Sequence, residues 1–250
     1  MIEFVVAEKV YGRGIQRKLE LLGWEMLTRL EGLEVEKLDL RIVKGGWVRV
    51  SVEGEDETVA ASILRRMYGE VPSMEEVREG VVLRGFAVDV GKVGYGLYVD
   101  AFLEEKDALL PLYEMRRLLS KGKRLPARML MRLYGIIENR PIGVLVKKVQ
   151  REEVEVTLSD EQISEFRKWL RRRLDVLVVT GATDREIRRA LARTDHLRDV
   201  IKIERLAFLA HALVCKSDTD AKGLIPEVGP HLPGSKLGVF SPKVILRSVA

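Results

Sequence analysis

Cysteine is nearly absent from this chain of 250 residues, and Cys215 is the only one. A single cysteine excludes a disulfide within the chain and a cluster of thiolate metal ligands. This usage is typical of a reducing compartment, so we expect a cytoplasmic protein. The three histidines also lack the short spacing of paired metal ligands, and we expect no metal site.

Long apolar runs and side-chain amides are scarce as well. No run approaches the roughly 18–20 apolar residues that a membrane span needs, and the first residues lack the basic region of a secretory signal. We therefore expect a soluble protein without a membrane partner. The amides number four: Asn139, Gln16, Gln150 and Gln162. Together with a charged fraction of 32%, this composition resembles that of a thermophile protein.

The chain also lacks a large excess of charge of one sign, because it has 43 Lys and Arg residues and 38 Asp and Glu residues. The net charge of +5 predicts a surface crossed by salt bridges rather than a uniformly basic one. Positive charge is nevertheless concentrated in two places. Seven cations lie between Met115 and Tyr134, and a run of five lies between Arg167 and Arg173.

The apolar pattern predicts an α+β protein in three parts, residues 1–72, 73–158 and 159–250. In the first part we expect strands at Ile2–Val10, Val35–Val43 and Trp47–Val52, and helices at Ile15–Leu30 and Glu57–Tyr68. Two glycines, at 45 and 46, predict the hairpin turn between the second and third strands. The order β-α-β-β-α is that of a ferredoxin-like unit whose last strand is missing or supplied by the next part of the chain.

The middle part reads as five short strands with a helical insert between the third and fourth. We expect the strands at Val81–Val90, Tyr95–Leu103, Ala108–Tyr113, Ile142–Lys148 and Val154–Leu158. This outline is typical of an OB-type barrel, a fold that binds nucleic acid more often than it performs chemistry. The insert extends from residue 115 to residue 134 and is basic.

The last part begins with a helix at Ser159–Leu174 that has one apolar face and many arginines on the others. We expect a second ferredoxin-like domain after it, in the order β-α-β-β-(α)-β. Its elements are a strand at Val176–Thr180, a helix at Asp184–Arg193, two strands at Val200–Leu206 and Phe208–Lys216, a turn or short helix at Gly223–Leu232, and a strand at Lys236–Phe240.

The middle part also resembles the RNA-binding repeat of the ribosomal protein S-one type. The resemblance rests on Gly85, on the run Gly96-Leu97-Tyr98-Val99-Asp100, on a Leu-rich third strand, and on Val144–Val149 with Val156–Ser159 at the end. It implies that Tyr98 is the exposed aromatic on which a base stacks. The family often has a histidine where this chain has Pro111.

From these observations we expect an RNA-binding surface made of two aromatic residues and eight cations. We expect Tyr95 and Tyr98 to stack on bases and the nearby cations to contact phosphates. The alternative is that the tyrosines simply pack at the barrel rim and that the arginine helix is a solvated face paired with Glu161 and Glu165. The cations are Arg84, Lys92, Lys147, Lys148, Arg167, Lys168, Arg171 and Arg172.

Other signals are weaker. A small-molecule site near Gly12–Gly14 or Gly181–Asp184 is conceivable, although the third glycine of a dinucleotide fingerprint is absent. His211 and Cys215 fall on one face of a predicted strand, but nothing assembles a nucleophile, a base and an oxyanion hole. We therefore expect no catalytic residue and no cofactor.

Finally, the chain resembles an uncharacterised archaeal protein family of unknown function. The residues that carry this resemblance are Ala7–Gly12, Ala212–Lys216, Gly223–Pro226 and Gly238–Pro242. We expect a non-catalytic RNA-binding factor associated with translation, with ribosomal RNA or the ribosome as partner and a homodimer as a further possibility. The alternatives are an RNA-modifying or nucleotide-using enzyme that uses the barrel as its clamp, and a protein-interaction scaffold.

Overall fold

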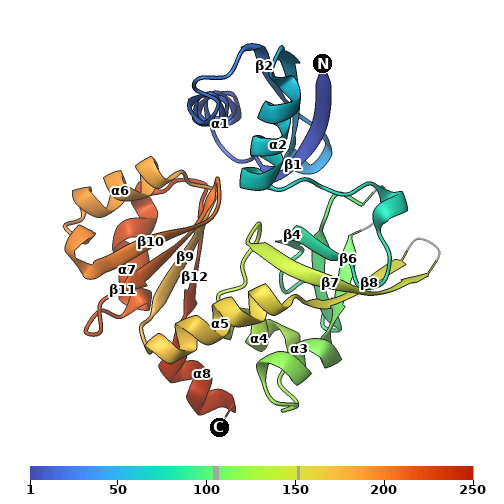
Figure 1. The fold of residues 1–250 in the computed structure, drawn as a ribbon. Helices are drawn as coiled ribbons and strands as arrows, with labels where there is room; N and C mark the ends of the chain where they lie inside the picture. The colour runs from blue at the N-terminus through green and yellow to red at the C-terminus, as the bar shows by residue number, and fades with distance from the viewer. Residues whose placement is uncertain (104–106, 151–152, 250) are drawn as a thin grey trace. The chain divides into compact units, whose positions relative to one another are not determined.

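The computed structural model describes residues 1–103, 107–150 and 153–249, and the chain divides into two compact units (Figure 1). The units are Met1–Pro72 and Ser73–Ala250. Across the described ranges, every helix is too short or too polar to cross a lipid bilayer.

The first unit is a three-stranded antiparallel sheet with two helices. Strands β1 (Ile2–Lys9), β2 (Val35–Ile42) and β3 (Trp47–Gly54) have the order β1-β3-β2, with α1 (Ile15–Arg29) after β1 and α2 (Glu57–Tyr68) after β3. These elements appear where the apolar pattern predicts them. Their inner faces form a core that includes Leu22, Met26, Trp47, Val50 and Leu64.

The fourth strand of a ferredoxin-like unit, which we expected to be missing or supplied by the next part of the chain, is represented only by a short bridge. Glu70 pairs with Val6 of β1, and the amide of Val71 donates to the carbonyl of Val5 at 2.9 Å. Pro72 follows directly and has no N–H to continue the ladder. The glycines between β2 and β3 form a 3₁₀ turn, in which a side chain at Gly46 would approach the carbonyl oxygen of Val10 to 2.9 Å.

The middle of the chain forms a closed five-stranded barrel, as predicted. Its strands are β4 (Val82–Val88), β5 (Gly96–Asp100), β6 (Ala108–Pro111), β7 (Pro141–Gln150) and β8 (Glu153–Leu158). They close in the order β4-β5-β6-β8-β7, with β6 parallel to β8 and the other described pairings antiparallel. Inward-facing residues fill the interior, among them Leu83, Leu97, Val99, Leu110, Val144 and Val156.

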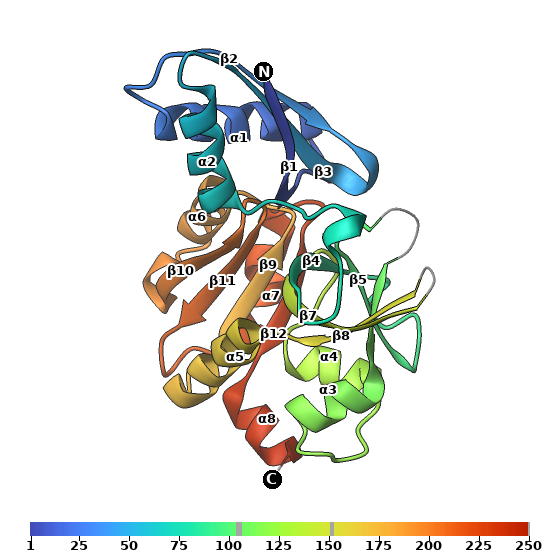
Figure 2. The same ribbon diagram turned by 45° about the vertical axis from the view of Figure 1, so that its right-hand side comes forward.

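Several strand boundaries within the barrel differ from the prediction by one to three residues, and two of the differences concern tyrosines. The third strand ends at Pro111 rather than at residue 113. Pro111 is still extended and serves as the N-cap of helix α3 (Leu112–Leu119), which starts at the next residue. The second strand begins at residue 96, so Tyr95 lies in the turn before it. The insert then contains a second helix, α4 (Ala127–Leu133), and Figure 2 shows α3 and α4 together beneath the barrel strands.

The last part of the chain forms a four-stranded antiparallel sheet in the order β10-β11-β9-β12. Its strands are β9 (Val176–Thr180), β10 (Val200–Ala207), β11 (Ala210–Cys215) and β12 (Lys236–Phe240). Helix α5 (Asp160–Arg172) leads into it, and α6 (Asp184–Arg193) and α7 (Ala221–Val228) connect its strands. The element order is the predicted one. Two details were not predicted: α7 continues past Pro226, and a final helix, α8, follows at Pro242–Val249.

The barrel and the second sheet share one hydrophobic core. Four rings meet at the junction, where Trp169 and Tyr134 lie 5.1 Å and 5.6 Å from Phe240, and Phe166 stacks on Phe240 at 6.0 Å. Tyr134 also forms a backbone bridge with Phe240. The junction is therefore packed like the interior of one domain.

Candidate nucleic-acid interface

Two tyrosines form an ordered pair on the outside of the barrel. Tyr98 lies on β5 and Tyr95 in the turn before it, and their rings meet edge to face with centroids 6.2 Å apart. Their hydroxyl oxygens lie 2.7 Å apart. This hydrogen bond is the largest cause of the raised pKa of Tyr98, so the phenol is neutral at physiological pH. Tyr95 is 55% exposed, and its ring is accessible to a partner.

The strand register places Tyr98 in a row of outward-facing residues across four strands. Tyr98 is opposite Leu109 on β6, Leu109 is opposite Glu155 on β8, and Glu155 is opposite Lys148 on β7. Residues that are paired across neighbouring strands project from the same face of a sheet. The row therefore combines an aromatic ring, an aliphatic side chain, a carboxylate and an ammonium group.

A third tyrosine, which was not among the predicted site residues, borders the same face. Tyr113 is 57% exposed, and its hydroxyl donates to Glu155. This hydrogen bond is the main cause that raises the pKa of Tyr113 to about 12. Tyr113 was expected inside the third strand, where alternation alone gave it no special position. Its one signal in the sequence was that it lies just before the basic insert.

The basic insert forms a shallow pocket beside Tyr113. The ring shares this cavity of about 540 Å³ with one glycine and four cations, Arg116, Arg117, Lys121 and Arg124. Two of the arginines are partly engaged: Arg117 pairs with Glu114 at 2.6 Å, and Arg116 donates to the carbonyl of Leu125 at 2.9 Å. Lys121 and Arg124 are exposed, so the wall of the pocket is cationic.

Glu114 anchors this wall to the barrel. It is buried at the start of α3 and accepts hydrogen bonds from Arg117 at 2.6 Å and from the hydroxyl of Thr157 at 2.7 Å. Burial alone would raise the pKa of Glu114, but these two donors outweigh it and lower the pKa. The carboxylate thus fixes the orientation of α3 against β8.

Four of the predicted cations lie on the barrel itself and are exposed, namely Arg84 and three lysines. Lys147 and Lys148 project from β7. Lys92 lies in the turn between β4 and β5 and pairs with Asp89 at 2.5 Å, which raises the pKa of the lysine. The side chains of all three lysines are exposed to solvent, and Lys148 belongs to the row of Tyr98.

Arg84 has a structural contact that the sequence could not indicate. It lies on β4, and its guanidinium donates to the carbonyl of Leu206 on β10 at 2.5 Å. The contact ties the barrel to the second sheet, so part of the hydrogen-bonding capacity of Arg84 is used within the protein.

The arginine-rich helix α5 is divided by its contacts. Glu204 of β10 accepts from Lys168 at 3.5 Å, from Arg172 at 3.0 Å and from the indole of Trp169 at 3.2 Å. Burial would raise the pKa of Glu204, but these donors lower it. Arg167 and Arg171 are exposed one turn apart, and within the described ranges neither forms an ion pair.

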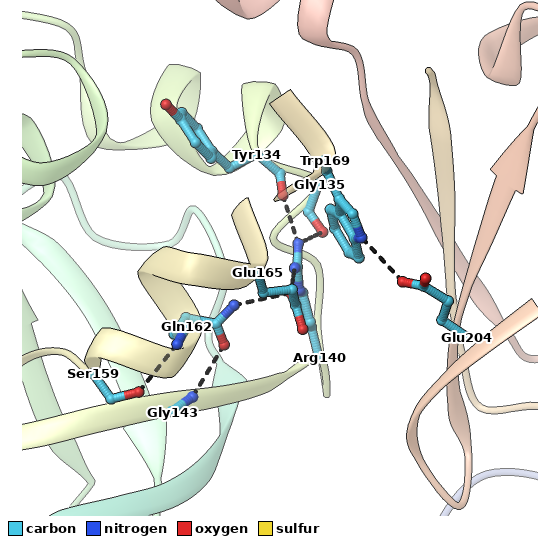
Figure 3. A network of polar contacts seen from close by, with 9 residues as sticks. All are labelled: Tyr134, Gly135, Arg140, Gly143, Ser159, Gln162, Glu165, Trp169 and Glu204. Atoms are coloured by element: carbon cyan, nitrogen blue, oxygen red, sulfur yellow. Dashed lines mark hydrogen bonds and ion pairs between the residues drawn. The ribbon is translucent and has the colours of Figure 1, made fainter. Parts of the chain in front are cut away.

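A buried arginine fixes α5 on the barrel (Figure 3). Arg140 is 0% exposed and donates to the carbonyls of Tyr134 at 2.5 Å and Gly135 at 3.0 Å, and to the carboxylate of Glu165 on α5 at 2.9 Å. Its guanidinium also lies over the ring of Phe166 at 4.9 Å. Nothing in the sequence around Arg140 distinguishes this buried arginine from the exposed ones.

The same helix is joined to β7 through Gln162. Its side-chain oxygen accepts from the amide of Gly143 at 3.1 Å, and its amide nitrogen donates to Glu165 at 3.0 Å. Because α5 packs on β7 and Tyr98 lies on β5, the ten predicted residues fall into two groups. Tyr95 and Tyr98 share the barrel surface with the lysines, whereas Arg167 and Arg171 lie on the separate surface of α5.

The weaker candidate sites from the sequence, at Gly12–Gly14, at Gly181–Asp184 and at His211 with Cys215, do not have the geometry of a binding or catalytic site. At Gly181–Asp184 the capping box of Thr183 and Glu186 already engages the first amides of α6. Helix α1 begins at Gly14 in the left-handed conformation without a side-chain cap. Burial lowers the pKa of His211 to about 4 and raises the pKa of Cys215 to about 12, so neither is charged near neutral pH. Within the described ranges, no three His, Cys, Asp or Glu side chains are grouped as metal ligands would be.

Comparison with known families gives three consecutive matches. The DUF2110 N-terminal domain matches residues 3–74, the DUF2110 central domain residues 77–170, and the DUF2110 C-terminal domain residues 174–240. No curated protein matches the chain. The central match covers the barrel together with α5, and the C-terminal match covers the four-stranded sheet.

Proposed function

The chain belongs to the DUF2110 family, and we propose from its geometry that it is a non-catalytic RNA-binding factor. The observation that carries the proposal is the pair of Tyr95 and Tyr98, held edge to face on the outside of a closed barrel. With Tyr113 it forms a surface that we call the tyrosine face.

The tyrosine face suits unpaired bases. Stacking on an aromatic side chain contributes about 1–3 kcal/mol per base and tolerates any sequence, because every base has a π-face. Bases inside a duplex are already stacked and cannot reach such a surface. The ligand that fits is therefore single-stranded RNA, bound without strong preference for sequence.

The cations around the tyrosine face suit the phosphates of the same strand. Lys147 and Lys148 are exposed on β7, where Lys148 belongs to the row of Tyr98, and Lys121 and Arg124 line the pocket beside Tyr113. Phosphate contacts of this kind weaken steeply as salt is added. Arg167 and Arg171 on α5 extend the positive surface for a longer RNA.

We also infer the finer fold assignments. The strand order of the barrel, its parallel pairing of β6 with β8 and its helices after the third strand support an OB-type barrel of the ribosomal S-one kind. The sheet orders β1-β3-β2 and β10-β11-β9-β12 support ferredoxin-like flanking domains. Small rigid modules with broad phosphate contact suit a cytoplasmic factor that binds ribosomal RNA or the ribosome.

The proposal is tested by measuring the affinity of the full chain for a short labelled single-stranded RNA by fluorescence anisotropy. Tyr98→Ala should weaken binding about 5- to 150-fold, which corresponds to the loss of one stacked base. Lys147→Ala with Lys148→Ala should weaken binding and flatten its dependence on salt. Trp24→Ala, which removes an exposed aromatic side chain in the first unit, serves as the control and should have no effect.

Two results would overturn the proposal. One is the absence of measurable RNA binding at low salt. The other is binding that Tyr98→Ala and Tyr95→Ala leave unchanged while the variants remain folded by circular dichroism.

A further inference from the structure

A cleft lies between α4 and the edge strand β12, and no residue of the row that contains Tyr98 lines it. Its volume is about 780 Å³. It is lined by residues of α4, the segment after α4, β12, α7 and α8, and also by Asp175 and the turn after β4. Small-molecule sites usually measure about 300–1,000 Å³ and are mostly apolar. The size and position of this cleft are those of a ligand site.

The walls of the cleft are held in place by the shared core. Tyr134, just after α4, bridges to Phe240 at the end of β12, and the two rings lie 5.6 Å apart. Close by, a side chain at Gly238 would approach Ile137 to 2.5 Å, so the two walls are in close contact below the cleft. A ligand would thus enter a preformed site and would not have to order it.

The apolar lining is aliphatic. Met131, Ile137, Leu237 and Val239 are among the side chains that form it, and Val244 of α8 is half exposed at its border. Among the described residues that line the cleft, none has an aromatic ring or a side-chain amide. The cleft therefore offers neither a stacking surface nor an amide to recognise a nucleobase, and an aliphatic body fits it better.

The polar lining carries surplus positive charge. Its two carboxylates have donors within the protein: Asp175 accepts from the hydroxyl of Ser241 at 2.7 Å, and Asp220 accepts from the backbone amide of Lys222 at 2.9 Å. Of the three cations, Arg128 gives only its Nε to the carbonyl of Gly91. Arg132 and the ammonium group of Lys222 form no ion pair with any described residue and are exposed at the cleft.

We propose that this cleft binds an aliphatic anion, a hydrocarbon chain with one carboxylate or phosphate head. The chain lies along Ile137, Leu237 and Val239, and the head is held by Arg132 and Lys222. Buried aliphatic groups contribute about 0.8 kcal/mol for each methylene, and a charged head gains from cations that lack an internal partner. This site is independent of the tyrosine face and of RNA binding.

The proposal is tested by isothermal titration calorimetry on the full chain with decanoate, decyl phosphate and decanol, the two anions below their micelle concentrations and decanol below its solubility limit. Both anions should bind more tightly than decanol, by about tenfold, because only they engage the cations. The stronger of the two anions identifies the head group. Arg132→Ala combined with Lys222→Ala should remove the preference for anions, whereas Arg189→Ala on α6 should leave it intact.

A second variant tests where the hydrocarbon chain of the ligand lies. Val244→Trp places a large ring at the border of the cleft on an exposed helical position, and it should weaken decanoate binding without affecting RNA binding. The proposal is overturned if neither anion binds, if decanol binds as tightly as the anions, or if Val244→Trp and the double variant bind both anions like the unchanged protein. Because RNA affinity is measured on the same variants, failure of this site is distinct from failure of the tyrosine face.

Discussion

At the scale of single residues, the surface of the barrel is organised by hydrogen bonds between side chains. Tyr98 is oriented by Tyr95, and Tyr113 by Glu155. A ring that is already held in one orientation loses little freedom when a base stacks on it. The role of these hydroxyl groups is therefore to position rings, and each can be tested without a ligand.

The contact of Tyr113 with Glu155 predicts a titration. Glu155→Gln removes the carboxylate that holds the phenolic proton, so the pKa of Tyr113 should fall from about 12 toward its ordinary value near 10. The measurement is the pH titration of tyrosine ring carbons by NMR. Tyr134 is the control, because burial raises its pKa to about 12 and the substitution should leave that value unchanged. An unshifted Tyr113 would show that the hydrogen bond does not persist in solution.

At the scale of elements, the most informative contact is that of Arg140 with α5. A buried charge that loses its partner costs about 3–5 kcal/mol, whereas replacement of the pair by an apolar group of similar size often costs little. Arg140 serves three acceptors, so its removal takes this donor from two backbone carbonyls and leaves Glu165 with the amide of Gln162 but without its cation.

Arg140→Ala should therefore lower the free energy of unfolding by about 3 kcal/mol. Arg140→Met, which keeps most of the volume, should lower it less. Both values come from urea denaturation followed by tryptophan fluorescence. Trp169 reports on this unit because it packs beside the guanidinium at 5.2 Å, whereas Trp24 and Trp47 report on the first unit. Arg167→Ala on the exposed face of α5 should change stability by less than about 0.5 kcal/mol. Equal losses for Arg140→Ala and Arg167→Ala would contradict this role.

Much of the fold could be predicted at this scale, because alternation and glycine breaks are local. The barrel strands and most elements around both sheets lie within a few residues of their expected positions. The contacts that decide the site are not local. Arg84 meets Leu206 across 122 positions in sequence, and Arg172 meets Glu204 across 32. The sequence shows these cations but not their partners, so it could not separate the engaged from the available ones.

At the scale of the whole molecule, the chain has two open sheets and a barrel but only two compact units. The barrel and the second sheet make one compact unit, because four rings join their interiors. The first unit has its own core and its own sheet. Two cooperative units are therefore expected, although the family matches distinguish three domains.

Phe240→Ala tests this cooperativity. Removal of a buried phenylalanine ring costs about 3–5 kcal/mol. Since Phe240 contacts rings from both sides of the junction, amides of β4–β8 and β9–β12 should lose protection together in hydrogen exchange. Phe4→Ala, in the core of the first unit, should leave both sets protected. Loss of protection confined to β9–β12 would show that the barrel is stable alone.

The position of Glu204 has a consequence for selectivity. By accepting from Trp169, Lys168 and Arg172, this carboxylate occupies on α5 the place that a phosphate would otherwise take. A polyanion that approaches this surface must either displace Glu204 or avoid it, and avoidance leaves Arg167 and Arg171 as points of contact. Under the proposed RNA binding, Glu204 would compete with phosphates for the donors of α5 and limit indiscriminate binding to this helix.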